Sequence, residues 1–326
     1  MLTLEKFLER VDALEEARIL LAALEFKIFT VLNRKKMTSR QITLKSKCHP
    51  EAMESLLNAL VALGALRLQA GKYSSAQDMY KHFCESSPHY KRGTVHLKKE
   101  NNDEWTNLIT AIRKGRDPKK FEGGDTPKFR RNFTFAMHER SLRYRDEIAR
   151  IVARQPVGKL LDIGAGPASY SAAILKKDKN ATATALDRST AIKVAKELIG
   201  DSPLNKRFRF VSGDLFDTSY GKGYDTVFFS NILHIYNRKQ NKVLFKKING
   251  SLVKGGRLIL VDLFLKENRV EPYNAALFSL TMLMFTATGK TYSFAETEKL
   301  LSECGFHKFT RQNVKEGSAI IQAYKK

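Results

Sequence analysis

Three acidic residues, each placed at or just after the end of an apolar run, are the first feature of the sequence that could do chemistry. Two glycines stand beside the first acid, in the segment LDIGAGPASY. The acids and glycines concerned are Asp162, Gly164, Gly166, Asp187 and Asp214. Small residues let the backbone turn sharply and approach a nucleotide-like ligand closely. Ser169 replaces the third glycine of a dinucleotide fingerprint, so the pattern disfavours a pyrophosphate cofactor.

The three acids match the three parts of S-adenosylmethionine. A carboxylate at Asp162 would repel phosphates but suits the cationic amino-acid end of that molecule. Asp187 lies about where an acid accepts both hydroxyls of a ribose. Asp214 can accept from the exocyclic amine of an adenine while Leu215 packs on the ring. Each acid alone could be an ordinary loop residue, but three in register after successive strands predict S-adenosylmethionine as the cofactor.

A histidine follows the fourth apolar run, in SNILHIY, and Asp262 closes the fifth, RLILVDL. A single histidine near an apolar run usually belongs to the core or the surface. At the carboxyl edge of a sheet, however, imidazole can take a proton from a hydroxyl group near neutral pH. Methyl transfer from a sulfonium is an in-line displacement that needs alignment and such a base. His234 is therefore a candidate base.

The elements that must position these residues begin at about Lys159, where short apolar runs alternate with amphipathic stretches. The sequence predicts helices over Pro167–Lys177, Ser189–Ile199, Arg238–Leu252 and Phe294–Cys304. Two further apolar runs, HKFTRQNV and SAIIQAYK, come at the end. This alternation predicts an α/β fold with a mostly parallel, doubly wound sheet covered by helices on both faces. In such a sheet the ligand lies at the carboxyl ends of the strands.

The first part of the chain has a different pattern. Residues 4–33 have helical periodicity, a short helix runs from Thr38 to about Lys45, and another is expected from Pro50 to Leu63. A hairpin with its turn at Ala70-Gly71 follows, so the order is that of a winged helix. The helix that would read DNA carries no Arg or Lys, which makes DNA binding improbable. We expect a packing or dimerisation domain over residues 1–95 and a catalytic domain with connecting helices over 96–326.

Composition narrows the remaining possibilities. The net charge is +23, and its bases are spread along 326 residues, which favours a generally basic surface over nucleic-acid or anionic-surface binding. The three cysteines form no CxxC pair or metal-ligand cluster, so we expect no metal site and a reduced, cytoplasmic compartment. The longest apolar stretch, Ala275 to Ala287, is too short to span a bilayer, and the N-terminus lacks the apolar region of a signal peptide.

The ordered set of motifs resembles the S-adenosylmethionine-dependent O-methyltransferases of the plant caffeate and acetylserotonin type and their bacterial small-molecule relatives. The likeness covers nearly the whole chain and includes FTFAMHERS, LDIGAGPASY, VSGDLF, SNILHIY, LVKGGRLILVDLF and GKTYSFAETEKLLSECGF. It implies a Rossmann-like catalytic domain behind a winged-helix-like dimerisation domain, and a homodimer formed largely through the latter. It also implies methyl transfer to a hydroxyl group of a small, aromatic or apolar acceptor.

The resemblance also assigns roles to residues by position. Beyond the acids, the glycines and Leu215, it places further residues at the cofactor: Met137, Ser141 and Ser230. His234 stands at the position of the family's catalytic base, with Asp262 near it. The acceptor pocket would lie between the domains, lined by Phe133, Phe278, Met282, Met284 and Phe285.

Two departures from the family pattern leave alternatives open. Many members have Asp-Trp after the histidine, where this chain has Ile235 and Tyr236. Plant members place an acid near the base at the position of Thr291, which cannot supply a carboxylate. Methylation of sulfur, nitrogen or an activated carbon on the same scaffold is therefore the alternative within enzymes. A nucleic-acid-binding protein with a vestigial cofactor site is the alternative from another class.

Overall fold

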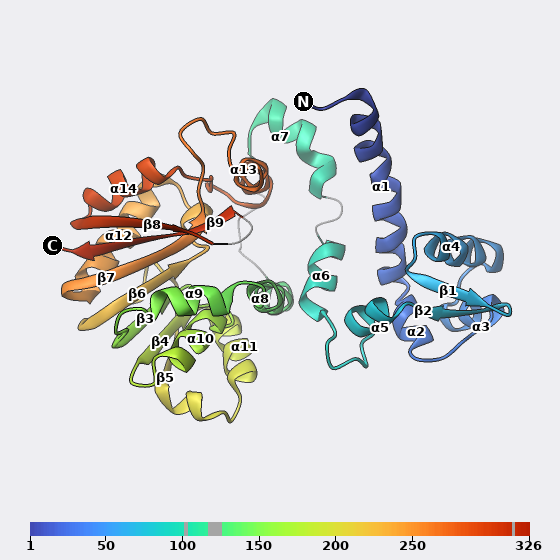
Figure 1. Ribbon diagram of the computed structural model, residues 1–326, viewed down its shortest axis with the longest axis horizontal. Coiled ribbons are helices and arrows are strands. Elements are labelled where there is room, and N and C mark those ends of the chain that lie inside the picture. The colour runs from blue at the N-terminus through green and yellow to red at the C-terminus, as the bar shows by residue number, and fades with distance from the viewer. Residues whose placement is uncertain (101–103, 117–125, 315–316) are drawn as a thin grey trace. The chain divides into compact units, whose positions relative to one another are not determined.

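The computed structural model describes residues 1–100, 104–116, 126–314 and 317–326 (Figure 1). It divides into two compact units, Met1–Asn102 and Asp103–Lys326. The domain boundary expected after residue 95 falls inside a helix, α6 (Arg92–Glu100). In the part of the chain that the structure describes, no helix has both the length and the apolar character needed to cross a membrane.

The first unit consists of short helices and one hairpin. Its elements are α1 (Leu4–Glu25), α2 (Ile28–Leu32), α3 (Ser39–Ser46), α4 (Pro50–Ala62), β1 (Leu66–Gln69), β2 (Lys72–Ser75), α5 (Gln77–Phe83) and α6. Thr38 and Gln41 form a reciprocal capping box that starts α3. Ala70 and Gly71 both have positive φ, as a two-residue hairpin turn requires. The single helix expected over residues 4–33 is broken at Lys27, whose φ is 52°.

The core of the first unit lies among α2, α3, α4 and β1. Its central side chains are Ile28, Leu32, Ile42, Leu57 and Leu60, all buried. The N-terminal half of α1 takes no part in this core. There, Leu4, Phe7, Leu8, Val11 and Leu14 are between 48% and 74% exposed within the chain. The unit therefore leaves one apolar helix surface uncovered.

The second unit is built on a seven-stranded sheet in the order β5-β4-β3-β6-β7-β9-β8. The strands are β3 (Lys159–Ile163), β4 (Thr182–Asp187), β5 (Phe208–Ser212), β6 (Tyr224–Ser230), β7 (Leu252–Leu263), β8 (Phe306–Asn313) and β9 (Ser318–Lys325). The strands from β5 to β7 are parallel, and β9 is antiparallel to both of its neighbours. The chain order reverses between β3 and β6, which is where α/β sheets bind ligands.

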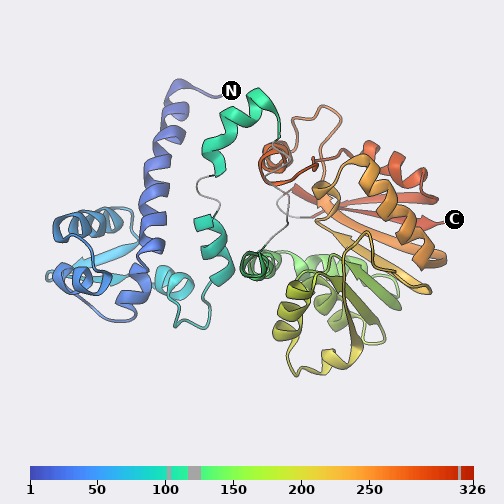
Figure 2. The same ribbon diagram turned by 180° about the vertical axis from the view of Figure 1, so that it is seen from behind.

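The helices of this unit cover both faces of the sheet (Figures 1 and 2). They are α7 (Leu108–Lys114), α8 (Pro127–Ser141), α9 (Arg145–Val152), α10 (Ser169–Lys177), α11 (Ser189–Ile199), α12 (Arg238–Ser251), α13 (Tyr273–Phe285) and α14 (Phe294–Ser302); η1 (Glu104–Asn107), η3 (Pro203–Arg207) and η4 (Leu233–Ile235) are short 3-10 turns. In β6, Val227 and Phe229 pack toward α12 and α14, whereas Phe228 packs toward α9 and α10. Burial on both faces explains why the strands read as continuous apolar runs.

Candidate active site

The glycine loop after β3 is shaped by close backbone approaches. Gly164 has a φ of +69°, and a Cβ at this position would lie 2.4 Å from Cδ1 of Ile232. Its N–H donates to the Leu186 carbonyl at 2.9 Å, which joins the loop to the end of β4. The Gly166 N–H donates to Oδ2 of Asp187 at 2.7 Å. A Cβ at Gly164 would therefore collide with Ile232 unless that side chain moved. The N–H of Gly166 binds directly to Asp187, the residue expected at the ribose.

Asp162 and Asp187 are both buried acids, and the charge of Asp187 affects the ionisation of Asp162. Asp162 is 3% exposed and accepts a hydrogen bond from the Ser171 hydroxyl of α10. Burial, aided by the charge of Asp187, raises the pKa of Asp162 to about 7 although the Ser171 hydrogen bond opposes the shift. Burial also raises the pKa of Asp187, against hydrogen bonds from the backbone of Gly166 and Arg188. A cationic or hydroxyl-bearing ligand would compensate this buried acidity.

The third acid, Asp214, is held in a compact turn. Its Oδ1 accepts from the Phe216 N–H at 2.7 Å, and Leu215 is 9% exposed. The ammonium of Lys247, on α12, donates to the carbonyls of Leu215, Phe216 and Thr218 and so fixes the turn from behind. The sequence analysis did not identify Lys247, since nothing in a lysine on a helix shows which carbonyls it will reach.

Tyr236 lies beside the acids expected to bind the adenosine part of the cofactor. Its ring meets that of Phe216 edge-on, with centroids 5.1 Å apart. Burial raises the pKa of its hydroxyl; the charge of Arg188 opposes this rise, and the charges of Asp214 and Asp187 add to it. The sequence analysis treated Tyr236 only as a departure from the family pattern. The structure brings this residue to the same place as the two predicted cofactor acids.

His234 and Asp262 form a buried pair beyond this cluster. Nδ1 of His234 lies 2.7 Å from Oδ1 of Asp262, and the backbone N–H of His234 donates to Oδ2 at 3.4 Å. Oδ1 also accepts from the Leu263 N–H at 2.7 Å, so the carboxyl group is fixed to the end of β7. Phe278 of α13 meets the imidazole ring edge-on at 4.8 Å. Because the carboxyl oxygen occupies the Nδ1 side, Nε2 is left as the basic nitrogen.

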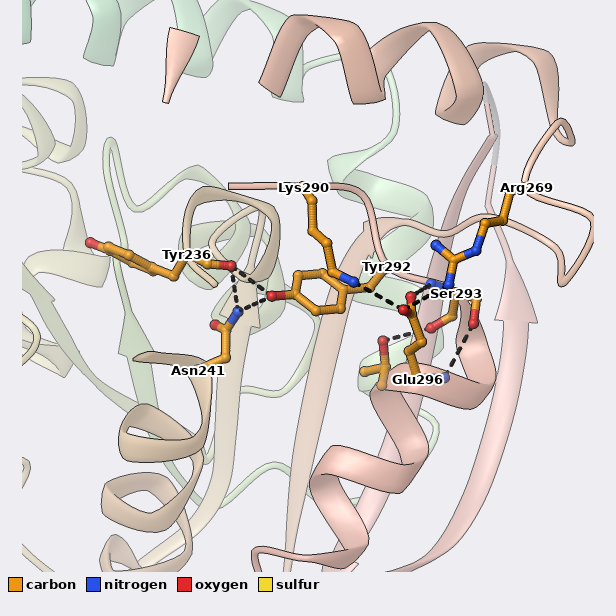
Figure 3. Close-up of polar contacts among 8 residues, drawn as sticks. Tyr236, Asn241, Arg269, Lys290, Tyr292, Ser293 and Glu296 are labelled. Carbon is orange, nitrogen blue, oxygen red and sulfur yellow. Dashed lines mark hydrogen bonds and ion pairs between the residues drawn. The ribbon is translucent and has the colours of Figure 1, made fainter. Parts of the chain in front are cut away.

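Polar contacts from Asn241 and Tyr292 hold the turn that carries His234, and Figure 3 shows those that reach Tyr236. The side-chain amide of Asn241 donates to the carbonyls of Leu233 and Tyr236, both at 2.9 Å. The Tyr292 hydroxyl donates to the same Tyr236 carbonyl at 2.8 Å. At Gly289, a Cβ would lie 2.2 Å from the His234 carbonyl oxygen, so glycine permits this loop to pack against the turn.

Thr291 lies in the same loop and is 2% exposed. Its hydroxyl oxygen is buried and has no hydrogen-bond partner among the residues the structure describes. The position where plant members carry an acid is therefore filled here by an inward-facing group without charge. Any carboxylate support for His234 at this end of the site falls to Asp262.

Glu296, at the start of α14, ties this loop down (Figure 3). It accepts from the Lys290 ammonium at 2.9 Å, from the Arg269 guanidinium at 2.8 Å, and from the Ser293 N–H at 2.9 Å. These donors outweigh the effect of burial and lower its pKa to about 2. The interaction therefore stabilises the folded state fully above the ordinary glutamate pKa of about 4.3, and the stabilisation is lost as the pH falls through about 2.

We expect Glu296→Gln to lower the free energy of unfolding at about pH 7, and the deficit to shrink toward about pH 3 as the native glutamate takes up its proton. Denaturant unfolding of both proteins across this range measures the change. Glu303→Gln is the control. Glu303 also pairs with two cations, Arg238 and Lys242, but it is more exposed than Glu296. A deficit that stayed constant with pH would show that Glu296 acts through hydrogen bonding alone.

The other cofactor candidates lie on α8 and at the end of β6. The Ser141 hydroxyl donates to the His138 carbonyl of its own helix at 2.7 Å, and Met137 is half-buried. Oγ of Ser230 accepts from the Asn231 side chain at 2.8 Å. Nothing in these contacts tests a role at the cofactor, so these assignments stay predictions.

A cavity of about 210 Å³ opens beside Phe278. Among the five residues expected at the acceptor pocket, Phe278 lines this cavity, whereas Met282 and Met284 are buried at 6% and 3% exposure. Phe133 stacks on Phe129 with centroids 6.0 Å apart, and the ring of Phe285 meets Trp105 at the same separation. Arg140 and Tyr144 also line the cavity; the sequence analysis quoted Arg140 within a motif but assigned it no role.

The site also contains no metal cluster: across the described ranges, no three His, Cys, Asp or Glu residues come together as ligands would. The acids instead present carboxylate acceptors beside the backbone of the glycine loop, and acceptors fit the ammonium, hydroxyl and amine groups of S-adenosylmethionine.

Comparison with known proteins identifies the family of both units. The O-methyltransferase domain model matches residues 105–307, and the O-methyltransferase dimerisation domain model matches residues 10–84. The tetracenomycin polyketide synthesis 8-O-methyl transferase TcmO of Streptomyces glaucescens is 25% identical over 89% of this chain and 87% of its own length. The L-tyrosine C(3)-methyltransferase of Streptomyces lavendulae is 25% identical over 90% and 84%.

A solved structure gives the same picture of the fold. Human N-acetylserotonin methyltransferase in complex with S-adenosylmethionine superimposes with a TM-score of 0.83 at 20% identity, over 98% of this chain and 96% of that one. The family model for the catalytic domain spans more than half of the 326 residues. The chain therefore belongs to the S-adenosylmethionine-dependent O-methyltransferase family.

Proposed function

We propose that this O-methyltransferase methylates a hydroxyl group of a small aromatic molecule and that His234 is the general base. The observation that carries the proposal is the buried pair of His234 and Asp262 at 2.7 Å, beside the cluster of acids that fits the cofactor. The relatives named above act on a tetracenomycin polyketide and on L-tyrosine, which supports an aromatic acceptor.

The acids would bind the cofactor, and His234 with Asp262 would carry out the proton transfer. S-adenosylmethionine, when bound, supplies a methyl carbon activated by the sulfonium. Asp187 and Asp214 would hold the ribose and the adenine, and Asp162 would face the amino-acid end. The acceptor hydroxyl gives its proton to Nε2 of His234 as its oxygen forms the new bond to carbon, while the carbon–sulfur bond breaks and its electron pair stays on sulfur. Asp262 then stabilises the imidazolium through Nδ1–H.

Carbon methylation is the second candidate, because the Streptomyces lavendulae relative is named for it. In a phenol, the carbon beside the hydroxyl becomes nucleophilic when the hydroxyl is deprotonated, so His234 would serve as base in both reactions. Incubation with methyl-labelled S-adenosylmethionine and a panel of phenols distinguishes the two. An O-methyl product supports the proposal, and a ring-methylated product supports the alternative.

We also propose that the protein is a homodimer held through its N-terminal unit. Phe7, Val11 and Leu14 lie one and two turns apart on α1, so they share one helix face, and all are at least half exposed within the chain. A dimerisation domain model covers this segment from residue 10. A partner subunit would remove this apolar surface from water.

The dimer proposal is tested by replacing Phe7 and Val11 with lysine in one variant. We expect this variant to sediment as a monomer and to retain its helical content, because two charges cannot be buried in an apolar interface without a large cost. A matched control replaces Glu9 and Glu16 by lysine on the opposite face of α1 and should remain dimeric. Two dimeric variants, measured by light scattering after size exclusion, would place the interface elsewhere.

The cysteines and the sequence of α4 bear on the cellular compartment and on nucleic-acid binding. We propose a cytosolic enzyme that works without nucleic acid, because Cys48, Cys84 and Cys304 are free thiols and α4 exposes no Arg or Lys. The net charge of +23 is then a property of the whole surface. Tight, salt-resistant binding to duplex DNA would contradict this assignment.

A further inference from the structure

The cavity next to Phe278 is a polar compartment with one strong charge. It is lined by Arg140, Tyr144, Asn274, Phe278, Thr281 and Ser318, with Leu263 and Leu277. Among the described residues that line it, Arg140 alone carries a formal charge. At about 210 Å³ the cavity is smaller than the roughly 300–1,000 Å³ of sites that enclose a whole drug-sized ligand. It is therefore the size of a subsite for one group of a larger ligand.

The cavity shares its walls with the catalytic pair. Phe278 lines the cavity and also meets the His234 ring edge-on at 4.8 Å. Leu263, another lining residue, directly follows Asp262 and donates its N–H to that carboxyl group. A small acceptor whose hydroxyl group lies at His234 could thus extend a second group around Phe278 into the cavity.

Arg140 supplies the one charged group among the described residues that line the cavity. The Tyr170 hydroxyl donates a hydrogen bond to the neighbouring Tyr144, and the rings of these two residues stack at 6.3 Å. The positive charge of Arg140 reaches this pair, where it opposes the burial that raises the pKa of Tyr170. A guanidinium presents a planar fork of N–H donors that matches a carboxylate in two parallel hydrogen bonds.

We propose that Arg140 binds a carboxylate of the methyl acceptor, so that the acceptor class is hydroxylated aromatic acids. This inference rests on the proposed function and specifies its substrate. The aromatic ring would pack against Phe278, the hydroxyl would face Nε2 of His234, and the carboxylate would enter the compartment lined by Arg140, Asn274 and Ser318.

Three matched pairs of acceptors test the proposal: para-hydroxybenzoic, para-hydroxyphenylacetic and para-hydroxycinnamic acids, each beside its methyl ester. The wild type should favour at least one acid over its ester in kcat/KM by about 10–100-fold, the range for hydrogen bonds to a charged group. Arg140→Gln should reduce the acids to the level of the esters and leave the esters unchanged. Arg143→Gln, an exposed arginine just beyond α8, is the control and should change neither.

The KM for S-adenosylmethionine shows whether Arg140 binds the carboxylate of the acceptor or that of the cofactor. If Arg140 binds the carboxylate of the cofactor instead, Arg140→Gln raises that KM about equally with every acceptor, and the proposal is overturned. Equal losses for acids and esters at unchanged cofactor KM also overturn it. Thermal unfolding and S-adenosylhomocysteine binding show whether the variant is folded.

Direct binding keeps the proposal testable if the proposed function itself fails. Should no phenol be methylated although S-adenosylmethionine binds, the hydroxyl-methylating function is wrong. Calorimetric titration of para-hydroxycinnamate into the S-adenosylhomocysteine complex then needs no turnover. We expect Arg140→Gln to weaken this binding by about 10–100-fold. Equal binding to wild type and variant, or binding to neither, contradicts the proposal.

Discussion

Replacing His234 with alanine should lower the rate of methyl transfer by about 10²–10⁴, the usual contribution of a positioned general base. Affinity for S-adenosylmethionine should stay the same, because the imidazole acts on the acceptor hydroxyl and its Nδ1 side is occupied by Asp262. Single-turnover measurements with the true acceptor report the chemical step without product release. Calorimetry on the same variant reports cofactor binding.

Asp262→Asn should cause a smaller loss, and the structure gives the reason. Oδ1 accepts from both Nδ1 of His234 and the Leu263 N–H, whereas Oδ2 meets only the His234 N–H at 3.4 Å. An asparagine would place its carbonyl oxygen at the Oδ1 position, where two donors need an acceptor. The imidazole would keep its tautomer and lose only the charge that stabilises the imidazolium. Asp262→Leu, which removes the acceptor altogether, should lose more.

Nearly full turnover in the His234→Ala protein would contradict a general base at this position. Alignment of an acceptor that is already ionised, such as a thiolate, would then account for catalysis. Conversely, if the alanine variant loses turnover and free imidazole restores it, the assignment of His234 as base is supported, since imidazole supplies a base without the side chain. If His234→Ala slows the methylation of neutral phenols but not of thiols, then His234 acts as a base for phenols, and alignment alone suffices for an ionised acceptor.

The sheet could be predicted from the sequence because its central strands are buried on both faces. Each becomes an apolar run, and each run ends at a residue that the fold brings to one edge; Asp162, Asp187 and His234 were found in this way. The place of β9 between β7 and β8 could not be read, because an apolar run does not record which neighbour it pairs with. The break at Lys27 could not be predicted either, because a single residue with a φ of 52° interrupts a pattern that is otherwise helical.

The polar supports of the site were harder to predict than the site itself. Asn241 and Tyr292 meet under the His234 turn although they are 51 residues apart in the chain. Lys247 lies on a helix where a basic residue normally faces water, so its type alone predicted a solvated surface. Such contacts depend on how helices pack on the finished sheet, which periodicity does not specify.

The affinity for S-adenosylmethionine should rise with pH through about 7, the pKa to which burial brings Asp162 in the free protein. Below this pH a proton occupies the carboxyl group that would face the cationic end of the ligand. Because the bound cation favours the ionised carboxylate, binding must displace that proton. Affinity should therefore fall about tenfold per pH unit well below pH 7 and level off above it, since each pKa unit is worth 1.36 kcal/mol.

Proton release measures this coupling directly. Calorimetry at about pH 6 in buffers of different ionisation enthalpy should show close to one proton released per ligand bound, because binding and deprotonation of Asp162 are linked. Asp162→Asn should abolish the release and flatten the pH profile. Ser171→Ala should move the midpoint upward, because the Ser171 hydrogen bond is what lowers the pKa of Asp162 against burial. A wild-type affinity that is constant from about pH 5.5 to 8, or a midpoint unmoved in Ser171→Ala, would remove Asp162 from the cationic end of the cofactor and leave its buried charge with a purely structural role.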